Sequence, residues 1–159
     1  MKISINSKWP FFEAYFDSKY ITIHDTRQII VLKEPREVRE YRVENKSGKD
    51  IVVYKIDGGL IDDNNLLKCD FGVYTEDDIL FFIELKGSDY IHALEQLLNT
   101  VNILVVKPQI KIGSLNARIV LSKMNVPRII PTQEKKLIKL LKCRNGDFIK
   151  QSQVLKEVI

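Results

Sequence analysis

Two acidic residues and a lysine stand at spacings that could support metal-dependent hydrolysis. Asp70 is followed after thirteen residues by Glu84, and Lys86 comes two positions later, in the segment KCDFGVYTEDDILFFIELKG. A pair of carboxylates can hold a hard divalent cation, which lowers the pKa of a bound water and stabilises charge on a phosphate. A neighbouring lysine adds a compact positive charge for the water or the phosphate. These three residues are therefore candidates for a catalytic site.

The residues around these charges alternate as in the two strands of a hairpin. The runs 66–74 and 79–86 flank a short acidic turn, and every odd-numbered side chain within the two runs is apolar. Because successive residues of a strand point to opposite faces, we expect the odd-numbered face to be the core face and to fix the register. The even-numbered face carries the charges together with Leu80 and Phe82, which favours partial cover on that side as well.

A turn centred near Asp77 would bring Asp70 opposite Glu84 on the neighbouring strand. Like charges that face each other across a ladder destabilise a sheet, so the pair needs a neutralising partner. A Mg²⁺ ion is such a partner, because it binds carboxylate and main-chain oxygens and keeps several waters. The alternative is a salt-bridged sheet edge formed by Glu84 and Lys86, with Asp70 as a solvated neighbour.

A helix is predicted directly after Lys86. Residues 87–89, Gly-Ser-Asp, break the strand and offer a capping side chain, and the apolar residues that follow recur at helical spacing. The apolar stripe comprises Tyr90, Ile91, Leu94, Leu97, Leu98 and Val101. Gln96 lies on the flank of this stripe.

The remaining segments complete an α/β pattern. Runs rich in β-branched residues predict strands at 20–24, 28–33, 41–45, 50–56, 102–106 and 117–122. Helices are predicted at 9–19, at 132–143 with Thr132 as the cap, and at 147–158. This order indicates a central mixed sheet flanked by helices. The length of 159 residues, without repeats or a low-complexity linker, favours a single domain over residues 1–159.

Composition and charge narrow the classes of function. Lys and Arg exceed Asp and Glu by 25 to 21, which gives a net charge of +4. That balance suits a polyanionic partner, although a merely basic soluble protein shares it. No apolar run approaches the ~20 residues of a membrane span, and the first residues lack the apolar stretch of a signal peptide, so we expect a cytoplasmic protein without membrane contact. Two cysteines and two histidines lack the spacing of a zinc site, so oxygen atoms would hold any metal.

At these residues the chain resembles the PD-(D/E)xK nuclease superfamily, whose restriction-endonuclease-like core has the order α-β-β-β-α-β. The family signature is an acid on one strand and an acid-x-lysine on the next, which here reads Asp70 and then Glu84-Leu85-Lys86. The two acids share a face, the second motif ends an apolar strand, and a capped amphipathic helix follows. The resemblance covers residues 50–122, and more of the chain if 9–19 is the leading helix.

The resemblance implies a nuclease that depends on Mg²⁺ or Mn²⁺. Asp70 and Glu84 would be metal ligands, and the carbonyl of Leu85 would be a third. Lys86 would orient or activate the attacking water and steady the charge of the phosphate. Each of these roles comes from the family and is carried onto the matching position of this sequence.

Other positions complete the family pattern or depart from it. Many members place a glutamine on the following helix, a catalytic helper position that Gln96 would fill. A RecB-like subgroup has tyrosine four residues later, but this chain has Thr100, which argues against that subgroup. Cys69 replaces a proline that often precedes the first acid, and Glu13 could be the acid of the first helix. Three turn aspartates are alternative ligands: Asp57, Asp62 and Asp63.

Cations that could bind a nucleic-acid backbone gather on the helix TQEKKLIKLLKCR. They are Lys135, Lys136, Lys139 and Lys142, with Lys107, Lys111, Lys123 and Arg128 in the preceding loops. A solvated helix face is the alternative explanation for these lysines. No zinc finger or recognition helix is visible, so specificity would come from the structure of the substrate or from a partner.

The function predicted from these observations is a Mg²⁺-dependent endonuclease that hydrolyses phosphodiester bonds of DNA, with RNA as an alternative substrate. A phage, a mobile element or a defence system would use such an enzyme. Small relatives often dimerise to cut both strands, so a homodimer or a larger complex fits this function. Two alternatives remain: a catalytically silent nuclease-fold subunit that binds nucleic acid or a protein, and an unrelated basic α/β interaction protein.

Overall fold

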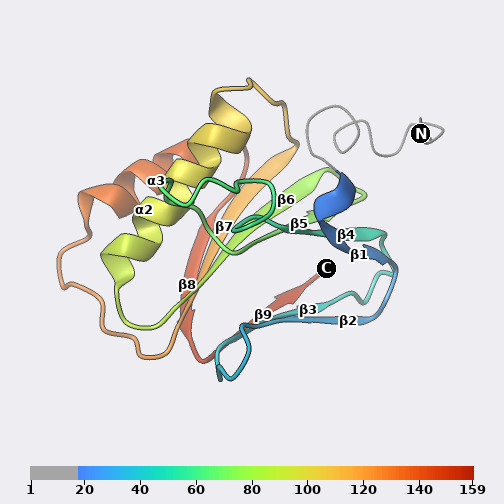
Figure 1. The fold of residues 1–159 in the computed structure, drawn as a ribbon, viewed down its shortest axis with the longest axis horizontal. Helices are drawn as coiled ribbons and strands as arrows, with labels where there is room; N and C mark the ends of the chain where they lie inside the picture. Colours follow the sequence, from blue (N-terminus) through green and yellow to red (C-terminus); the bar gives the residue numbers. More distant parts are fainter. Residues whose placement is uncertain (1–17) are drawn as a thin grey trace.

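The structure is a computed structural model that describes residues 18–159, which form two sheets and two α-helices (Figure 1). The larger sheet has the order β1 (Ile21–Asp25), β4 (Ile51–Lys55), β5 (Phe71–Thr75), β6 (Ile79–Lys86), β7 (Ser114–Leu121) and β8 (Phe148–Ser152). The smaller sheet has the order β2 (Ile29–Leu32), β3 (Glu40–Glu44) and β9 (Val154–Val158). The helices are α2 (Tyr90–Val101) and α3 (Thr132–Lys142), and a single 3₁₀ turn, Ser18–Tyr20, precedes β1.

The larger sheet is mixed, as the sequence predicts. Strands β1, β4, β5 and β6 pair antiparallel in succession, whereas β6, β7 and β8 are parallel. Helix α2 makes the crossover from β6 to β7, because parallel neighbours cannot be joined by a tight turn. The carboxyl ends of β6, β7 and β8 consequently lie at one edge of the sheet, and Lys86 is the last residue of β6 there.

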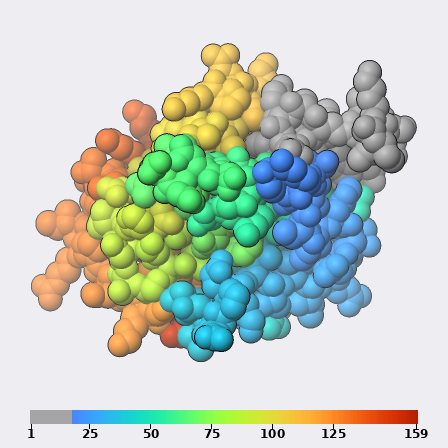
Figure 2. Space-filling view, viewed as in Figure 1, coloured from blue at the N-terminus to red at the C-terminus, as the bar shows by residue number. Residues whose placement is uncertain are grey.

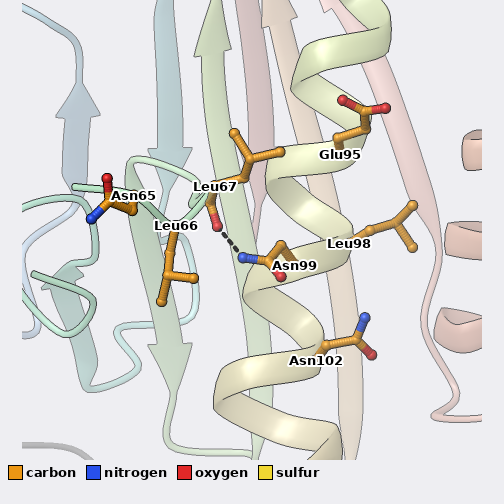
Figure 3. A pocket seen from close by; sticks show the side chains of 7 residues that line it. All are labelled: Asn65, Leu66, Leu67, Glu95, Leu98, Asn99 and Asn102. Atoms are coloured by element: carbon orange, nitrogen blue, oxygen red, sulfur yellow. Dashed lines mark hydrogen bonds between the residues drawn. The ribbon is translucent and has the colours of Figure 1, made fainter. Parts of the chain in front are cut away.

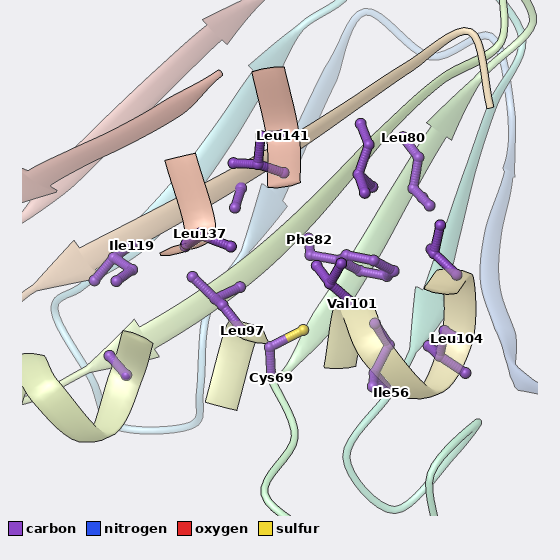
Figure 4. Packing of buried hydrophobic residues seen from close by; sticks show 14 of the residues in the cluster. Ile56, Cys69, Leu80, Phe82, Leu97, Val101, Leu104, Ile119, Leu137 and Leu141 are labelled. Atoms are coloured by element: carbon purple, nitrogen blue, oxygen red, sulfur yellow. The ribbon is translucent and has the colours of Figure 1, made fainter. Parts of the chain in front are cut away.

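Both faces of the larger sheet are buried, so the odd-numbered face is a core face as predicted, and the cover over the even-numbered face is more extensive than the partial cover expected. The even-numbered residues of β5 and β6 face α2 and α3 and join the larger core cluster, with Phe82 fully buried (Figure 4). The odd-numbered residues of the same strands form a second cluster with the smaller sheet, in which Tyr41 is fully buried. Within residues 18–159 the helices therefore cover one face of the larger sheet and the smaller sheet covers the other.

Most predicted strands are present, but the prediction of a strand at 102–106 is wrong. Residues Asn102–Val106 continue α2 as a π-helical turn, and the N–H of Lys107 donates to the carbonyl of Asn102 at 2.9 Å. A short apolar run of this kind has no period that separates a buried strand from a buried helical turn. Leu104 and Val105 are buried against the helix-side core, which decides the outcome.

The prediction of a last helix at 147–158 is also wrong. This segment forms β8 and β9, and Gln153 turns the chain between them with a φ of 68°. β8 extends the larger sheet beside β7, and β9 joins the smaller sheet parallel to β3. These tertiary partners override the weak local preference of the segment.

Both α-helices begin close to where the sequence predicts. Helix α3 begins at Thr132 as expected, but Pro131 is the N-cap residue and no side chain caps the helix. Asp89 caps α2 as predicted, since its carboxylate accepts the N–H of His92 at 3.0 Å. Most of the predicted helix at 9–19 lies outside the described residues, as does Glu13.

A buried ion pair joins the two sheets through Arg118 of β7. Its Nε donates to Oε2 of Glu157 on β9 at 2.6 Å, and its Nη1 donates to Oδ1 of Asp147 at 2.7 Å. The hydroxyl of Tyr41 on β3 donates to the same Glu157 oxygen at 3.1 Å. Arg118 is 2% exposed, so these contacts replace nearly all of its hydration and hold β9 of the smaller sheet against β7 of the larger one.

Arg118→Ala should destabilise the fold strongly, because it leaves the Glu157 carboxylate without its guanidinium partner in a mostly buried position. Breaking one partner of such a pair costs about 3–5 kcal/mol of the free energy of unfolding. Urea unfolding measures this change. Asp147→Ala is the matched control: the Asp147 side chain is 62% exposed, and its loss should cost less than about 1 kcal/mol. Equal small losses in both variants would contradict the anchoring role.

Candidate functional site

Asp70 lies at the start of β5, where the ladder to β6 ends. Phe71 pairs with Ile83 and Thr75 with Ile79, which is the register expected for a turn centred near Asp77. The main-chain N–H of Asp70 donates to the carbonyl of Ile83 at 3.1 Å, and its Oδ2 accepts the N–H of Leu85 at 2.8 Å. Its carboxylate is thereby fixed beside the Glu84-Leu85-Lys86 segment.

Glu84 is buried on the helix side of β6. Its residue is 2% exposed, and its Oε2 has no hydrogen-bond partner within the described residues. Its Oε1 lies 4.0 Å from Nζ of Lys86, which is at the outer limit of an ion pair. A buried carboxylate oxygen without a donor costs free energy, so this atom is a candidate for protonation or for contact with a cation.

Gln96 of α2 connects the lysine to the loop before β5. Nζ of Lys86 donates to Oε1 of Gln96 at 2.9 Å, and Nε2 of Gln96 donates to the carbonyl of Lys68 at 2.8 Å. The amide thus uses its acceptor for the ammonium group and its donor for the main chain. The structure brings together Asp70, Glu84, Lys86 and Gln96, the residues singled out in the sequence.

Thr100 supports the site in a way that the sequence reading missed. Its Oγ1 donates to the carbonyl of Gln96 at 2.8 Å and accepts the N–H of Cys69 at 2.9 Å. It thereby holds the residue that immediately precedes Asp70. The sequence did contain an indication of this role: Thr100 stands four residues after Gln96, so both side chains lie on one side of a helix.

Burial raises the pKa of both carboxyl groups. It raises the pKa of Asp70 to about 6, with Glu34 and Asp57 contributing in the same direction, while the Leu85 N–H opposes the shift. Burial, followed by the charge of Asp70, raises the pKa of Glu84 to about 9, and the charge of Lys86 and a side-chain hydrogen bond with Gln96 only partly offset this. Near neutral pH, Glu84 therefore carries a proton unless another positive charge arrives.

The donor set fits a hard divalent cation. Two carboxyl groups meet here, and one buried oxygen of Glu84 lacks a donor. Mg²⁺ is commonly held by one or two carboxylates and keeps several water ligands. Within residues 18–159, no group of three or more His, Cys, Asp or Glu side chains is placed to hold a metal.

The three aspartates named as alternative metal ligands have other surroundings. Oδ1 of Asp57 lies 3.5 Å from Nζ of the buried Lys68, and Asp63 accepts the N–H of Asn65 within a turn at 2.9 Å. Asp62 is exposed. The lysines predicted to bind nucleic acid are exposed on α3: Lys135, Lys136, Lys139 and Lys142.

A separate open groove of about 520 Å³ runs along α2 (Figure 3). Its lining residues are Asn65, Leu66, Leu67, Glu95, Leu98, Asn99 and Asn102. It adjoins the site through Asn99, which lies one helical turn beyond Gln96 and donates to the carbonyl of Leu67 at 2.5 Å. None of its lining residues is cationic, and it contains neither Asp70 nor Glu84.

No protein-family model, curated protein or solved structure matches this chain. The fold and site together define an α/β protein with a mixed sheet, a buried glutamate and a partly buried aspartate beside a lysine. The helices of residues 18–159 include none with the length and apolarity needed to cross a bilayer.

Glu84→Gln should remove most of the loss of stability that accompanies rising pH. Between the ordinary value of 4.5 and the raised value of about 9, the folded protein keeps a proton on Glu84 that the unfolded chain releases. The free energy of unfolding therefore falls as pH rises through this interval, with a slope approaching about 1.4 kcal/mol per pH unit. Glutamine cannot ionise, so only the smaller slope from Asp70, complete above about pH 6, should remain.

Urea unfolding at a series of pH values, in EDTA to exclude divalent cations, measures this effect. Glu37→Gln is the matched control, because the Glu37 side chain is 42% exposed and should leave the slope unchanged. Identical pH dependence in the wild type and in Glu84→Gln would show that Glu84 ionises as freely as an exposed glutamate.

Proposed function

We propose that the protein is a divalent-metal-dependent endonuclease that hydrolyses phosphodiester bonds of DNA. The observation that carries the proposal is the pair formed by the buried Glu84 and the partly buried Asp70. Within residues 18–159, Oε2 of Glu84 has no donor, and its Oε1 lies 4.0 Å from Nζ of Lys86, while Asp70 is fixed by the N–H of Leu85. A carboxylate pair of this kind binds a hard cation, and a lysine beside it suits a phosphate substrate.

The chain order of the elements supports a restriction-endonuclease-like core. Strands β4, β5 and β6 form an antiparallel meander, α2 follows, and β7 returns parallel to β6. This is the β-β-β-α-β part of the family order, and the acids stand at the corresponding strand ends. The leading helix of that core would fall in residues outside the described part.

Asp70 and Glu84 would hold Mg²⁺ or Mn²⁺, with the Leu85 carbonyl as a third protein ligand. The N–H of Leu85 points toward Asp70, and in a strand the carbonyl of the same residue points to the same side. When bound, the cation supplies a Lewis acid for the phosphate and lowers the pKa of the attacking water. Lys86 would donate to the phosphate or the water, while Gln96 keeps its ammonium in place.

The basic surface supports a nucleic-acid substrate. The lysines of α3 are exposed and could contact phosphates without reading the bases. A homodimer would allow both strands of a duplex to be cut, and a larger complex could supply specificity. A role in a phage, a mobile element or a defence system belongs to the same proposal.

Asp70→Ala, Glu84→Ala and Lys86→Ala should each lower cleavage by about 10²-fold or more, because each removes a charge from the reacting phosphate or from its metal. The assay is cleavage of supercoiled plasmid, linear DNA and RNA with Mg²⁺ or Mn²⁺, beside EDTA. Glu37→Ala and Lys46→Ala are matched controls, because their side chains are 42% and 70% exposed and neither belongs to the proposed site; both should cleave like the wild type.

Cleavage that survives all three substitutions would exclude this site. A wild type that binds Mn²⁺ through Asp70 and Glu84 but cuts nothing would favour a catalytically silent, nucleic-acid-binding subunit. Absence of both cutting and metal binding would favour the unrelated interaction protein.

Gln96→Ala should lower kcat by about 10- to 100-fold, because the Lys86 ammonium loses the acceptor that positions it. Metal affinity should be unchanged, since Gln96 is not among the proposed ligands. Single-turnover cleavage and Mn²⁺ titration separate these two quantities. Gln133→Ala on α3 is the matched control, because among residues 18–159 the Gln133 amide bonds only the Glu95 carboxylate, at 3.4 Å. Equal losses of metal affinity and kcat in Gln96→Ala would contradict a positioning role.

A further inference from the structure

The loop between β7 and α3 exposes large apolar side chains. Ile129 is 81% exposed, the highest value among the large exposed hydrophobic residues that the structure describes. Ile130 is 51% and Met124 is 45% exposed in the same loop. Isolated exposed apolar residues are ordinary, but a group of this size on one loop indicates a contact surface.

Two prolines restrict this loop. Pro127 and Pro131 bracket the Arg-Ile-Ile tripeptide 128–130, and Pro131 has a φ of −59° and a ψ of 152°. Proline fixes its own φ and restricts the residue before it to extended conformations. Val126 is partly buried against the helix-side core and anchors the base of the loop. The apolar side chains are thus presented with less conformational entropy to lose on binding.

The loop and helix α3 carry exposed charges of one sign along the chain, while the acids Glu37 and Glu95 approach them through Arg39 and Gln133. Between residues 122 and 142, the exposed charged side chains are all basic: Lys123, Arg128, Lys135, Lys136, Lys139 and Lys142. The single acid in this stretch, Glu134, is 5% exposed. It accepts hydrogen bonds from Tyr90 at 2.5 Å and from Lys150 at 3.1 Å, so it does not offset the basic surface. The surface complements a polyanion.

The loop begins beside the lysine of the proposed catalytic site. Ser122, its first residue, donates its N–H to the carbonyl of Lys86 at 3.2 Å and to that of Gly87 at 2.9 Å. Its Oγ accepts Nη1 of Arg39 at 2.6 Å, which ties the start of the loop to the smaller-sheet side as well. The orange region that contains the loop projects at the margin of the molecule (Figure 2).

We propose that residues 123–130 are a wedge that inserts Ile129 and Ile130 between stacked bases of the DNA substrate while the neighbouring cations hold its phosphates. The proposal rests on the proposed function and adds a way in which the substrate is deformed. Aliphatic wedges flanked by basic residues unstack base steps in this manner. An anionic membrane would also suit basic and apolar side chains. The hydrogen bonds from Ser122 to Lys86 and Gly87 place the loop beside the proposed catalytic lysine, and this position favours nucleic acid as the partner.

The test uses the full chain carrying Glu84→Gln, in EDTA, so that binding is observed without cleavage. A short DNA duplex and its single strand carry 2-aminopurine, whose fluorescence rises when the base is unstacked. The duplex should bind with a rise in fluorescence. Ile129→Ser with Ile130→Ser should abolish that rise and weaken binding about tenfold, the scale of losing a stacking contact. The dependence of binding on salt should not change, because the cations remain.

The matched control is Ile29→Ser with Val158→Ser, which removes two exposed apolar side chains of the smaller sheet, 54% and 57% exposed. It should bind and unstack the duplex like the parent protein. Equal behaviour of the two double variants, or no rise in fluorescence with the parent, overturns the wedge. Preferential binding of phosphatidylglycerol vesicles through Ile129 and Ile130 overturns it in favour of a membrane surface.

The two proposals fail in different ways. Unstacking that depends on Ile129 and Ile130, with a wild type that cuts no DNA in Mg²⁺ or Mn²⁺, would refute the hydrolysis and retain the wedge. Metal-dependent cutting with no unstacking would retain the nuclease and refute the wedge.

Discussion

The cover on both faces of β6 is the constraint on which the candidate site depends. Helix α2 and the helix-side core lie over the even-numbered face, and the smaller sheet lies over the odd-numbered face. Glu84 has therefore lost nearly all contact with water, and its ionisation is costly until a positive charge compensates for the burial. The same burial would strengthen the attraction of the site for a cation, because electrostatic interactions grow as the local dielectric falls. The architecture thus raises the pKa of a glutamate that would otherwise ionise readily.

The twelve residues of helix α2 both pack against the sheet and carry polar side chains of the candidate site. Its apolar stripe packs on the even-numbered face of the sheet, and the flank of that stripe carries Gln96 and Thr100. Because both polar side chains project from a helix anchored by Leu94 and Leu97, their positions follow from core packing. Sites built on packed elements hold their geometry more closely than sites built on loops.

The hairpin and α2 could be read from the sequence because their signals are local. Strict alternation fixed the register of β5 against β6, and Asp89 marked the start of the helix. The smaller sheet could not be read in this way, since β9 pairs with β3 more than a hundred residues earlier in the chain. The segment 147–158 has no strong period, so its partners decided its conformation. The burial of Glu84 could not be predicted from the sequence for the same reason, because the elements that cover each face of the sheet come from distant segments of the chain.

Two shielded acids of this fold, Glu157 and Glu84, differ in how their charge is compensated. Glu157 meets Arg118 through contacts of 2.6 and 3.1 Å and also accepts the hydroxyl of Tyr41, so its burial is compensated by donors. Glu84 has a distant ammonium that is shared with Gln96, a side-chain hydrogen bond with Gln96 that offsets its burial only in part, and, among residues 18–159, an oxygen without a donor. A salt bridge selected for stability would resemble the first arrangement. The second destabilises the fold whenever Glu84 is ionised without a partner, and that cost is understandable if the missing partner is a metal ion bound during function.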